Sequence, residues 1–206
     1  LEAEIVRNSP ALNITYTPRS FQVYANEFPQ SRYAFVGASI DGRRHEPFEP
    51  PEGSGSLVYI SLGTELNKSE RFFRRCVEAF GSTGMRVVMA IGDSVRPESL
   101  GPVPPAMMVR RRVPQLEVLS RASLFITHGG MNSVNEALFY GVPMLVVPVG
   151  NDQPTVARRV EELGLGEALD IREATPDVLR EAAMRVLSDR ECHARLSEFR
   201  QETRNA

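Results

Sequence analysis

Short apolar runs alternate with amphipathic segments from residue 57 to the end of the chain. Apolar runs of this length, bounded by glycine, proline or charged residues, predict buried strands, here within 57–63, 85–92, 101–114, 123–130, 142–150 and 166–171. The segments between them carry apolar residues at helical spacing and predict helices at 69–82, 114–122, 131–141, 152–166, 175–189 and 190–204.

The predicted strands are apolar throughout rather than alternating, which indicates a sheet covered on both faces. With a helix between successive strands, this predicts an α/β fold with a Rossmann-like, doubly wound parallel sheet. Such sheets bind ligands beyond the carboxyl ends of their strands. The residues that follow each strand are therefore the candidates for a binding site.

The first quarter of the chain has a different pattern. Residues 1–39 contain two short extended pieces, LNITYT and RYAFVG, joined by a polar, aromatic stretch. Residues 40–56 are rich in proline, glycine, serine and charge without periodicity, which is typical of a linker. We therefore expect a main domain at 57–206, preceded by a linker and by part of another domain.

Composition and charge limit the kinds of molecule and environment that the sequence predicts for this protein. The 206 residues carry a net charge of −2, so no basic field favours nucleic acid or an anionic membrane, and the arginines at 110–112 are typical of a solvated edge. Cys76 and Cys192 lie far apart and predict neither a disulfide framework nor a zinc site. No signal peptide or transmembrane segment is evident, so we expect a cytoplasmic protein, and the start at Leu1 suggests a fragment.

The stretch LFITHGGMNSVNEALFYGVP places His128, Gly129 and Gly130 between a predicted strand and a predicted helix. Glycines let a backbone approach a ligand closely, and the free N–H groups at a helix start attract anions. The alternative is a plain turn in which Asn132 or Ser133 caps the helix. An esterase oxyanion hole is excluded, because the chain has no G-x-S-x-G nucleophile motif.

A second glycine turn follows the strand at 57–63, where Gly63 and Thr64 could approach a phosphate or simply turn the chain. The stretch SLGTE is neither a Walker A loop nor a G-x-G-x-x-G dinucleotide motif.

Three further polar residues lie near predicted helix starts. Glu136 could accept hydrogen bonds from the hydroxyls of a ribose, or be a solvated helix acid. Asp152 and Gln153 could bind a polyol, or cap the helix that follows. The chain has no D-x-D pair, so a metal-held diphosphate is not indicated.

The order VPQLEVLSRASLFITHGGMNSVNEALFYGVPMLVVPVGNDQPTVARRVEELGLG resembles the donor-binding signature of family 1 glycosyltransferases, in particular the bacterial enzymes that glycosylate macrolides and other natural products. The resemblance continues upstream through LNITYTPRSFQ, RYAFVGAS and ISLGTE. It implies the C-terminal half of a GT-B fold, binding a UDP- or TDP-sugar without a metal or other cofactor. The acceptor would be a small hydrophobic molecule held by a second domain.

The resemblance also implies roles for individual positions. The diphosphate would lie against His128, Gly129, Gly130, Asn132, Ser133, Gly63 and Thr64, and the nucleoside against Arg112, Val113, Gln115 and Glu136. The donor sugar would be bound by Asp152 and Gln153. Arg112 stands where many relatives stack a tryptophan on the base; a guanidinium plane can also stack there, which leaves uridine and thymidine open.

Residues 1–39 resemble only the last part of the family's acceptor domain. That domain carries the histidine that activates the acceptor, so we expect no catalytic general base in this chain. The expected function is nucleotide-sugar binding for an inverting hexosyltransferase. The alternative is a non-catalytic donor-binding subunit that docks onto a separate acceptor subunit.

Overall fold

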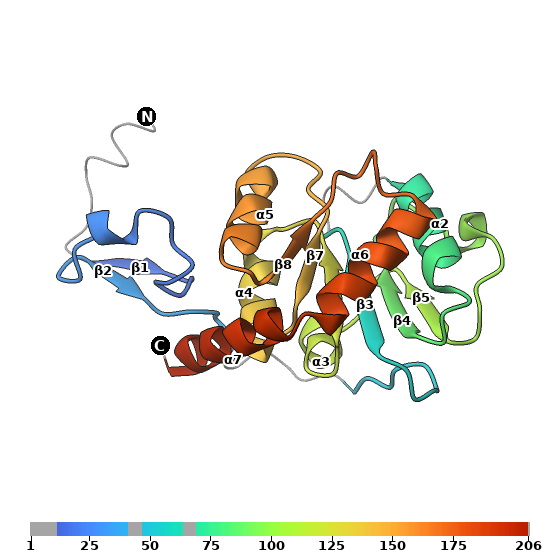
Figure 1. Cartoon of the computed structure of the whole chain (residues 1–206), viewed down its shortest axis with the longest axis horizontal. Coiled ribbons are helices and arrows are strands. Elements are labelled where there is room, and N and C mark those ends of the chain that lie inside the picture. The colour runs from blue at the N-terminus through green and yellow to red at the C-terminus, as the bar shows by residue number, and fades with distance from the viewer. Residues whose placement is uncertain (1–11, 41–46, 64–68, 206) are drawn as a thin grey trace.

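The structure, a computed structural model, describes residues 12–40, 47–63 and 69–205. Its centre is a six-stranded sheet with the strand order β5-β4-β3-β6-β7-β8, in which every neighbouring pair is parallel (Figure 1). The strands are β3 (Leu57–Ser61), β4 (Arg86–Ala90), β5 (Met107–Arg110), β6 (Leu124–Thr127), β7 (Met144–Val146) and β8 (Gly166–Ala168). The predicted Rossmann-like, doubly wound α/β fold is confirmed.

Helices cover both faces of this sheet. They are α2 (Glu70–Phe80), α3 (Gln115–Leu119), α4 (Met131–Tyr140), α5 (Gln153–Glu162), α6 (Pro176–Ser188) and α7 (Arg190–Asn205). The apolar residues of α2 and α6 pack on one face, and those of α3, α4, α5 and α7 pack on the other. There are also two short 3-10 helices, η1 (Ala25–Glu27) and η2 (Pro97–Leu100), and Leu100 of η2 packs into the core beside α2.

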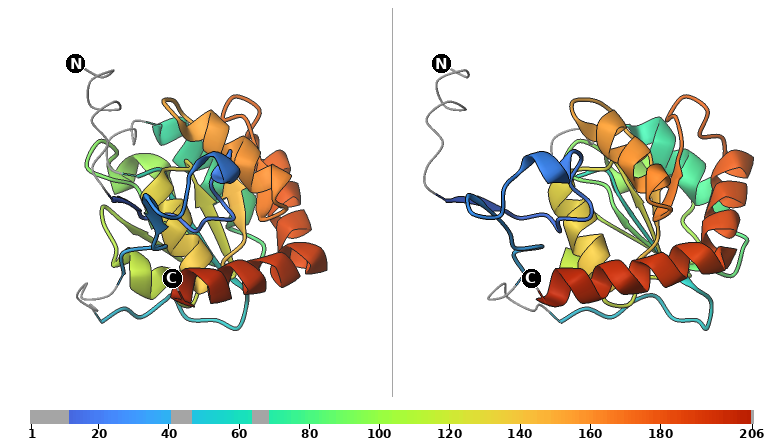
Figure 2. Two further views of the ribbon diagram at one scale, coloured as in Figure 1. Left: turned by 90° about the vertical axis from the view of Figure 1, so that its left-hand side faces the viewer. Right: turned by 60° about the vertical axis from the view of Figure 1, so that its left-hand side comes forward.

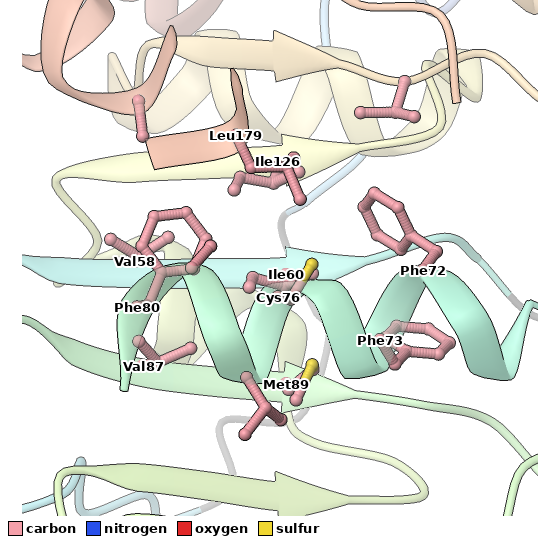
Figure 3. Packing of buried hydrophobic residues seen from close by; sticks show 14 of the residues in the cluster. Val58, Ile60, Phe72, Phe73, Cys76, Phe80, Val87, Met89, Ile126 and Leu179 are labelled. Carbon is pink, nitrogen blue, oxygen red and sulfur yellow. The ribbon is translucent and has the colours of Figure 1, made fainter. Parts of the chain in front are cut away.

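The core on the first face shows why the strands are apolar on both sides. Phe80 of α2 lies beside Val58 of β3 and Cys76 beside Ile60, and Phe72 belongs to the same core (Figure 3). The other strand residues face the second helix layer. Burial on both faces explains the continuous apolar runs in the sequence.

Local signals set the ends of the helices. The Ser69 side chain accepts a hydrogen bond from the Phe72 N–H and caps α2, and Thr175 caps α6 in the same way. Gly141 ends α4 in the left-handed region, at φ 71°. Pro114 was expected in the first turn of α3, but it lies one residue before that helix, at the N-cap.

Residues 12–40 form a separate unit with its own two-stranded parallel sheet, β1 (Asn13–Thr15) and β2 (Tyr33–Phe35). This unit lies beside α4, α5 and α7 (Figure 2). Arg159 of α5 donates to the carbonyls of Ser20 and Phe21. Further along, the carbonyl of Phe48, a buried residue, accepts from Arg121.

Both cysteines, Cys76 and Cys192, are buried free thiols. Burial raises the pKa of both thiols, and that of Cys192 reaches about 11. In the described part of the chain, every helix is too short or too polar to cross a membrane.

Candidate functional site

A cavity of about 530 Å³ lies at the carboxyl ends of β3 and β6. These two strands are neighbours in the sheet. β4 and β5 lie on one side of β3, whereas β6 and the strands after it lie on the other side, so the strand order reverses between β3 and β6. In doubly wound folds this reversal leaves a crevice in which ligands bind. Eight of the predicted site residues line the cavity: Gly63, Arg112, Val113, Gln115, His128, Gly130, Asn132 and Ser133.

His128 follows β6, and its ring lies between the backbones of Gly63 and Gly130. Burial lowers the pKa of the imidazole below its ordinary value of 6.5, an effect that the charge of Asp152 partly opposes. The ring is therefore neutral at pH 7 and carries one N–H donor. Its Nδ1 atom is buried and has no hydrogen-bond partner among the described residues.

The first turn of α4 opens into the same cavity. Its N-cap is Gly130, which has no side chain, and neither Asn132 nor Ser133 caps the helix. The backbone N–H groups of this turn consequently lack intrahelical acceptors and face the cavity with the positive end of the helix dipole. The structure therefore shows no side-chain cap at this helix, and the anion site stays a prediction.

Gly129 gives the turn its shape. Its φ of +87° lies in the left-handed region, and an added Cβ would be 2.8 Å from a methyl carbon of Val146. A side chain at this position would therefore distort the path from β6 into α4. Gly129 itself does not line the cavity.

A chain of hydrogen bonds crosses the base of the site. The Tyr59 hydroxyl donates to Gln115 Oε1 (2.9 Å), and Gln115 Nε2 donates to Glu136 Oε2 (2.6 Å) and to Ser133 Oγ (3.2 Å). Only 4% of Glu136 is exposed, so the interpretation of this residue as a solvated helix acid is wrong. Burial, together with the charge of Glu136, raises the pKa of the Tyr59 hydroxyl well above its usual range, which keeps it a donor.

Arginines form one rim of the cavity. Arg112 makes an ion pair with Asp93 (2.6 Å), and Arg111 lines the cavity beside it. Arg110 turns away and donates to the Val109 carbonyl. All three arginines are exposed, as expected for a solvated edge, and Arg111 and Arg112 also line the cavity.

Asp152 and Gln153 lie outside the cavity wall. Asp152 is exposed at the start of α5, and its side chain makes no cap hydrogen bond there. Gln153 is buried, and its Oε1 atom accepts from the N–H groups of Val149 (2.8 Å) and Gly150 (3.1 Å). Thr64 lies outside the described residues.

Sequence reasoning missed several lining residues, among them Tyr59, Ser61, Gly92, Asp93, Arg111 and Met131. Gly92 and Asp93 come shortly after the end of β4, so their place after a strand was a usable signal. Tyr59 lies inside an apolar strand, where nothing in the pattern separates it from core residues. Within the described ranges, no group of three His, Cys, Asp or Glu side chains is placed to hold a metal ion.

Residues 74–206 match the family described as the erythromycin biosynthesis protein CIII-like, C-terminal domain. The chain belongs to this family. It is 42% identical over 198 residues to the NDP-glycosyltransferase YjiC of Bacillus licheniformis, covering 95% of this chain and 50% of that protein. It is 36% identical over 195 residues to the oleandomycin glycosyltransferase of Streptomyces antibioticus, covering 94% and 45% respectively.

Solved structures with the same fold are also glycosyltransferases. A crystal structure described as the glycotransferase of kitacinnamycin superposes with a TM-score of 0.90 at 38% identity, covering 100% of this chain and 54% of that one. The described architecture is therefore the C-terminal half of a GT-B glycosyltransferase. The chain spans about half the length of the curated relatives it matches.

Proposed function

We propose that this chain is the nucleotide-sugar-binding half of an inverting, metal-independent glycosyltransferase, with a UDP-sugar as donor. The observation that carries the proposal is that the ring of His128 and the uncapped start of α4 line the same cavity. Backbone N–H groups and a ring N–H together suit a diphosphate. In this proposal residues 57–206 bind the donor, 40–56 link the domains, and 1–39 belong to the acceptor domain.

The cavity suggests how the donor lies. The diphosphate contacts His128 and the first turn of α4, and the nucleoside extends toward Gln115 and Glu136. Arg112, on the rim, has the planar, charged group needed to stack on a base. Asp152 would bind the sugar hydroxyls beyond the diphosphate; the support is that its charge acts on His128.

The reaction that fits this arrangement is a direct displacement. A general base outside this chain takes the proton of the acceptor hydroxyl, and the hydroxyl oxygen attacks the anomeric carbon. The bond from that carbon to the diphosphate oxygen breaks, and the configuration inverts. His128 and the α4 N–H groups stabilise the negative charge that develops on the departing diphosphate.

For the acceptor we propose a small hydrophobic natural product. The support is the similarity to the oleandomycin glycosyltransferase, since oleandomycin stands in that relative's name. The acceptor itself would be held by a domain outside this chain.

Calorimetry of the 206-residue chain with uridine, UMP, UDP and TDP tests the donor half of the proposal. We expect UDP to bind, and UDP-glucose to bind without transfer of its sugar to an acceptor. His128→Ala should weaken UDP by about tenfold, the loss of one hydrogen bond to a charged group, and leave uridine unchanged. No binding of UDP at millimolar concentration contradicts the proposal.

A second candidate is a donor-binding subunit that docks onto a separate acceptor subunit. The 12–40 unit has exposed apolar side chains that either an acceptor domain of the same chain or such a subunit would cover: Leu12, Ile14, Tyr16, Val23 and Tyr24. The upstream coding sequence separates the two candidates. An acceptor domain in the same reading frame excludes the separate subunit, and a stop codon before residue 1 supports it.

A further inference from the structure

The ring of His128 is enclosed by two residues that have no side chains. We propose that Gly63 and Gly130 are positioning residues for His128: the clearance that they leave fixes the imidazole with its Nε2–Cε1 edge at the cavity. This rests on the proposed diphosphate site. It assigns to the two glycines a role other than contact with the phosphates.

The clearances are small. A Cβ atom added at Gly130 would lie 2.6 Å from His128 Nε2 and 2.8 Å from Cε1. A Cβ atom added at Gly63 would lie 2.8 Å from each of the same two atoms. Cβ contacts below 3.0 Å are essentially never seen, so a side chain at either glycine requires a shift of the ring or of the backbone beside it.

Backbone geometry does not explain the glycine at 130. Gly63 has a φ of +78°, which favours glycine for conformational reasons alone. Gly130, in contrast, has φ −64° and ψ 133°, a conformation open to every residue. It is also an N-cap, where serine, aspartate or asparagine would stabilise the helix more. Neither backbone conformation nor helix capping therefore accounts for a glycine at 130, whereas clearance for the His128 ring does.

The second ring nitrogen of His128, Nδ1, does not fix the ring by a hydrogen bond. A functional histidine is commonly oriented by a hydrogen bond from its second nitrogen to a carbonyl or a carboxylate. Nδ1 of His128 is buried without such a partner in the part of the chain that the structure describes. Because Nδ1 has no such hydrogen bond, the orientation of the ring depends on the space that Gly63 and Gly130 leave for it.

Gly130→Ala tests this inference, because the alanine backbone is unstrained at this position. We expect UDP affinity to fall by about tenfold, the loss of one hydrogen bond to a charged group, and uridine affinity to stay the same. In a His128→Ala background the same substitution should change UDP affinity by less than about twofold, because there is no ring to displace. Equal losses in both backgrounds, or no loss in either, overturn the inference.

Gly63→Ala is the second variant, and it needs a control for backbone strain. Gly84 provides that control, since its φ is +74° and an added Cβ would meet no atom within 4 Å. We expect Gly63→Ala to weaken UDP more than uridine, and Gly84→Ala to leave both affinities unchanged. If Gly63→Ala still weakens UDP in the His128→Ala background, ring displacement is not the cause.

A readout without ligand keeps this inference separate from the proposed function. The chain has three histidines, so the ring resonances of His128 are assigned by their loss in His128→Ala. We expect Gly130→Ala to shift the Cε1–H and ring nitrogen resonances of His128 and to leave those of His193 in place. Unmoved His128 resonances overturn the inference even if UDP binds. If UDP does not bind to the unmodified chain, the proposed function fails while a shifted ring still supports the positioning role.

Discussion

Gln115 donates a hydrogen bond of 2.6 Å to the buried carboxylate of Glu136, and the two residues come from successive helices, α3 and α4. Both polar atoms of the Gln115 amide form hydrogen bonds, because its Oε1 atom also accepts from the Tyr59 hydroxyl. A buried carboxylate is costly unless it is hydrogen-bonded. The amide of Gln115 therefore stabilises the carboxylate of Glu136 within the wall of the proposed nucleoside site.

Gln115→Ala should accordingly destabilise the fold. The substitution removes a donor from Glu136 and the acceptor of the Tyr59 hydroxyl, which costs about 1–3 kcal/mol of unfolding free energy. Urea unfolding measures this loss. Gln201→Ala, at an exposed position on α7, is the matched control and should change stability by less than about 0.5 kcal/mol. Equal stabilities for the two variants would show that the amide contributes nothing to the wall.

The ion pair between Arg112 and Asp93 should matter for binding and not for stability. Both side chains are more than half exposed, at 77% and 58%, and exposed pairs contribute about 0–1 kcal/mol. If Arg112 stacks on the base, Arg112→Ala will weaken uridine and UDP by the same factor. Calorimetry with both ligands measures this. Arg180→Ala, which breaks the exposed pair with Asp177 on α6, is the control and should leave both affinities unchanged.

The pattern of the sequence was sufficient for the sheet. Each strand of the sheet's interior is buried on both faces, so the apolar runs carried the signal without ambiguity. The helix ends were equally clear where a cap residue was present, as at Ser69, Thr175 and Gly141. These features depend on neighbours in the sequence, which is why a single sequence contains them.

The parts of the site that depend on distant contacts were not predictable. Nothing in the sequence states that Gly63 lies against the ring of His128, since this depends on β3 and β6 being neighbours. The burial of Glu136 has the same origin, because a solvated acid would have the same spacing along α4. The 12–40 unit is attached largely through main-chain carbonyls, such as that of Tyr16, which leave no mark on the pattern.

The low pKa of His128 makes the stability of the fold depend on pH. Burial lowers the pKa in the folded state, while the unfolded chain keeps the ordinary value of 6.5. Above 6.5 neither state binds the proton, and this residue then has no pH-dependent effect. As the pH falls through 6.5, the unfolded state takes up more protons than the folded state, so the unfolding free energy decreases.

Urea unfolding of the unmodified chain and of His128→Gln, from about pH 8 to about pH 5, isolates this effect. We expect the stability difference between the two proteins to shift in favour of the glutamine variant below pH 6.5. Asp152→Asn should enlarge the shift, because the charge of Asp152 raises the pKa of His128. A difference that stays constant with pH contradicts the burial of the ring.

Arg159 should hold the 12–40 unit in place. Its guanidinium donates to the carbonyl of Phe21 (2.9 Å) and to that of Ser20 (2.9 Å), and its side chain is 21% exposed. Arg159→Met removes both hydrogen bonds and keeps much of the apolar stem. We therefore expect faster hydrogen exchange at the amides of residues 13–36, with no change in the central sheet.

The neighbouring residue Arg158 provides the matched control. It lies on the same helix but is 72% exposed and pairs only with Glu162 among the described residues, so Arg158→Met should leave exchange in residues 13–36 unchanged. Faster exchange throughout the sheet in Arg159→Met would indicate general destabilisation instead of release of the unit. Unchanged exchange would mean that the contacts of Asn135 and Glu202 hold the unit without Arg159.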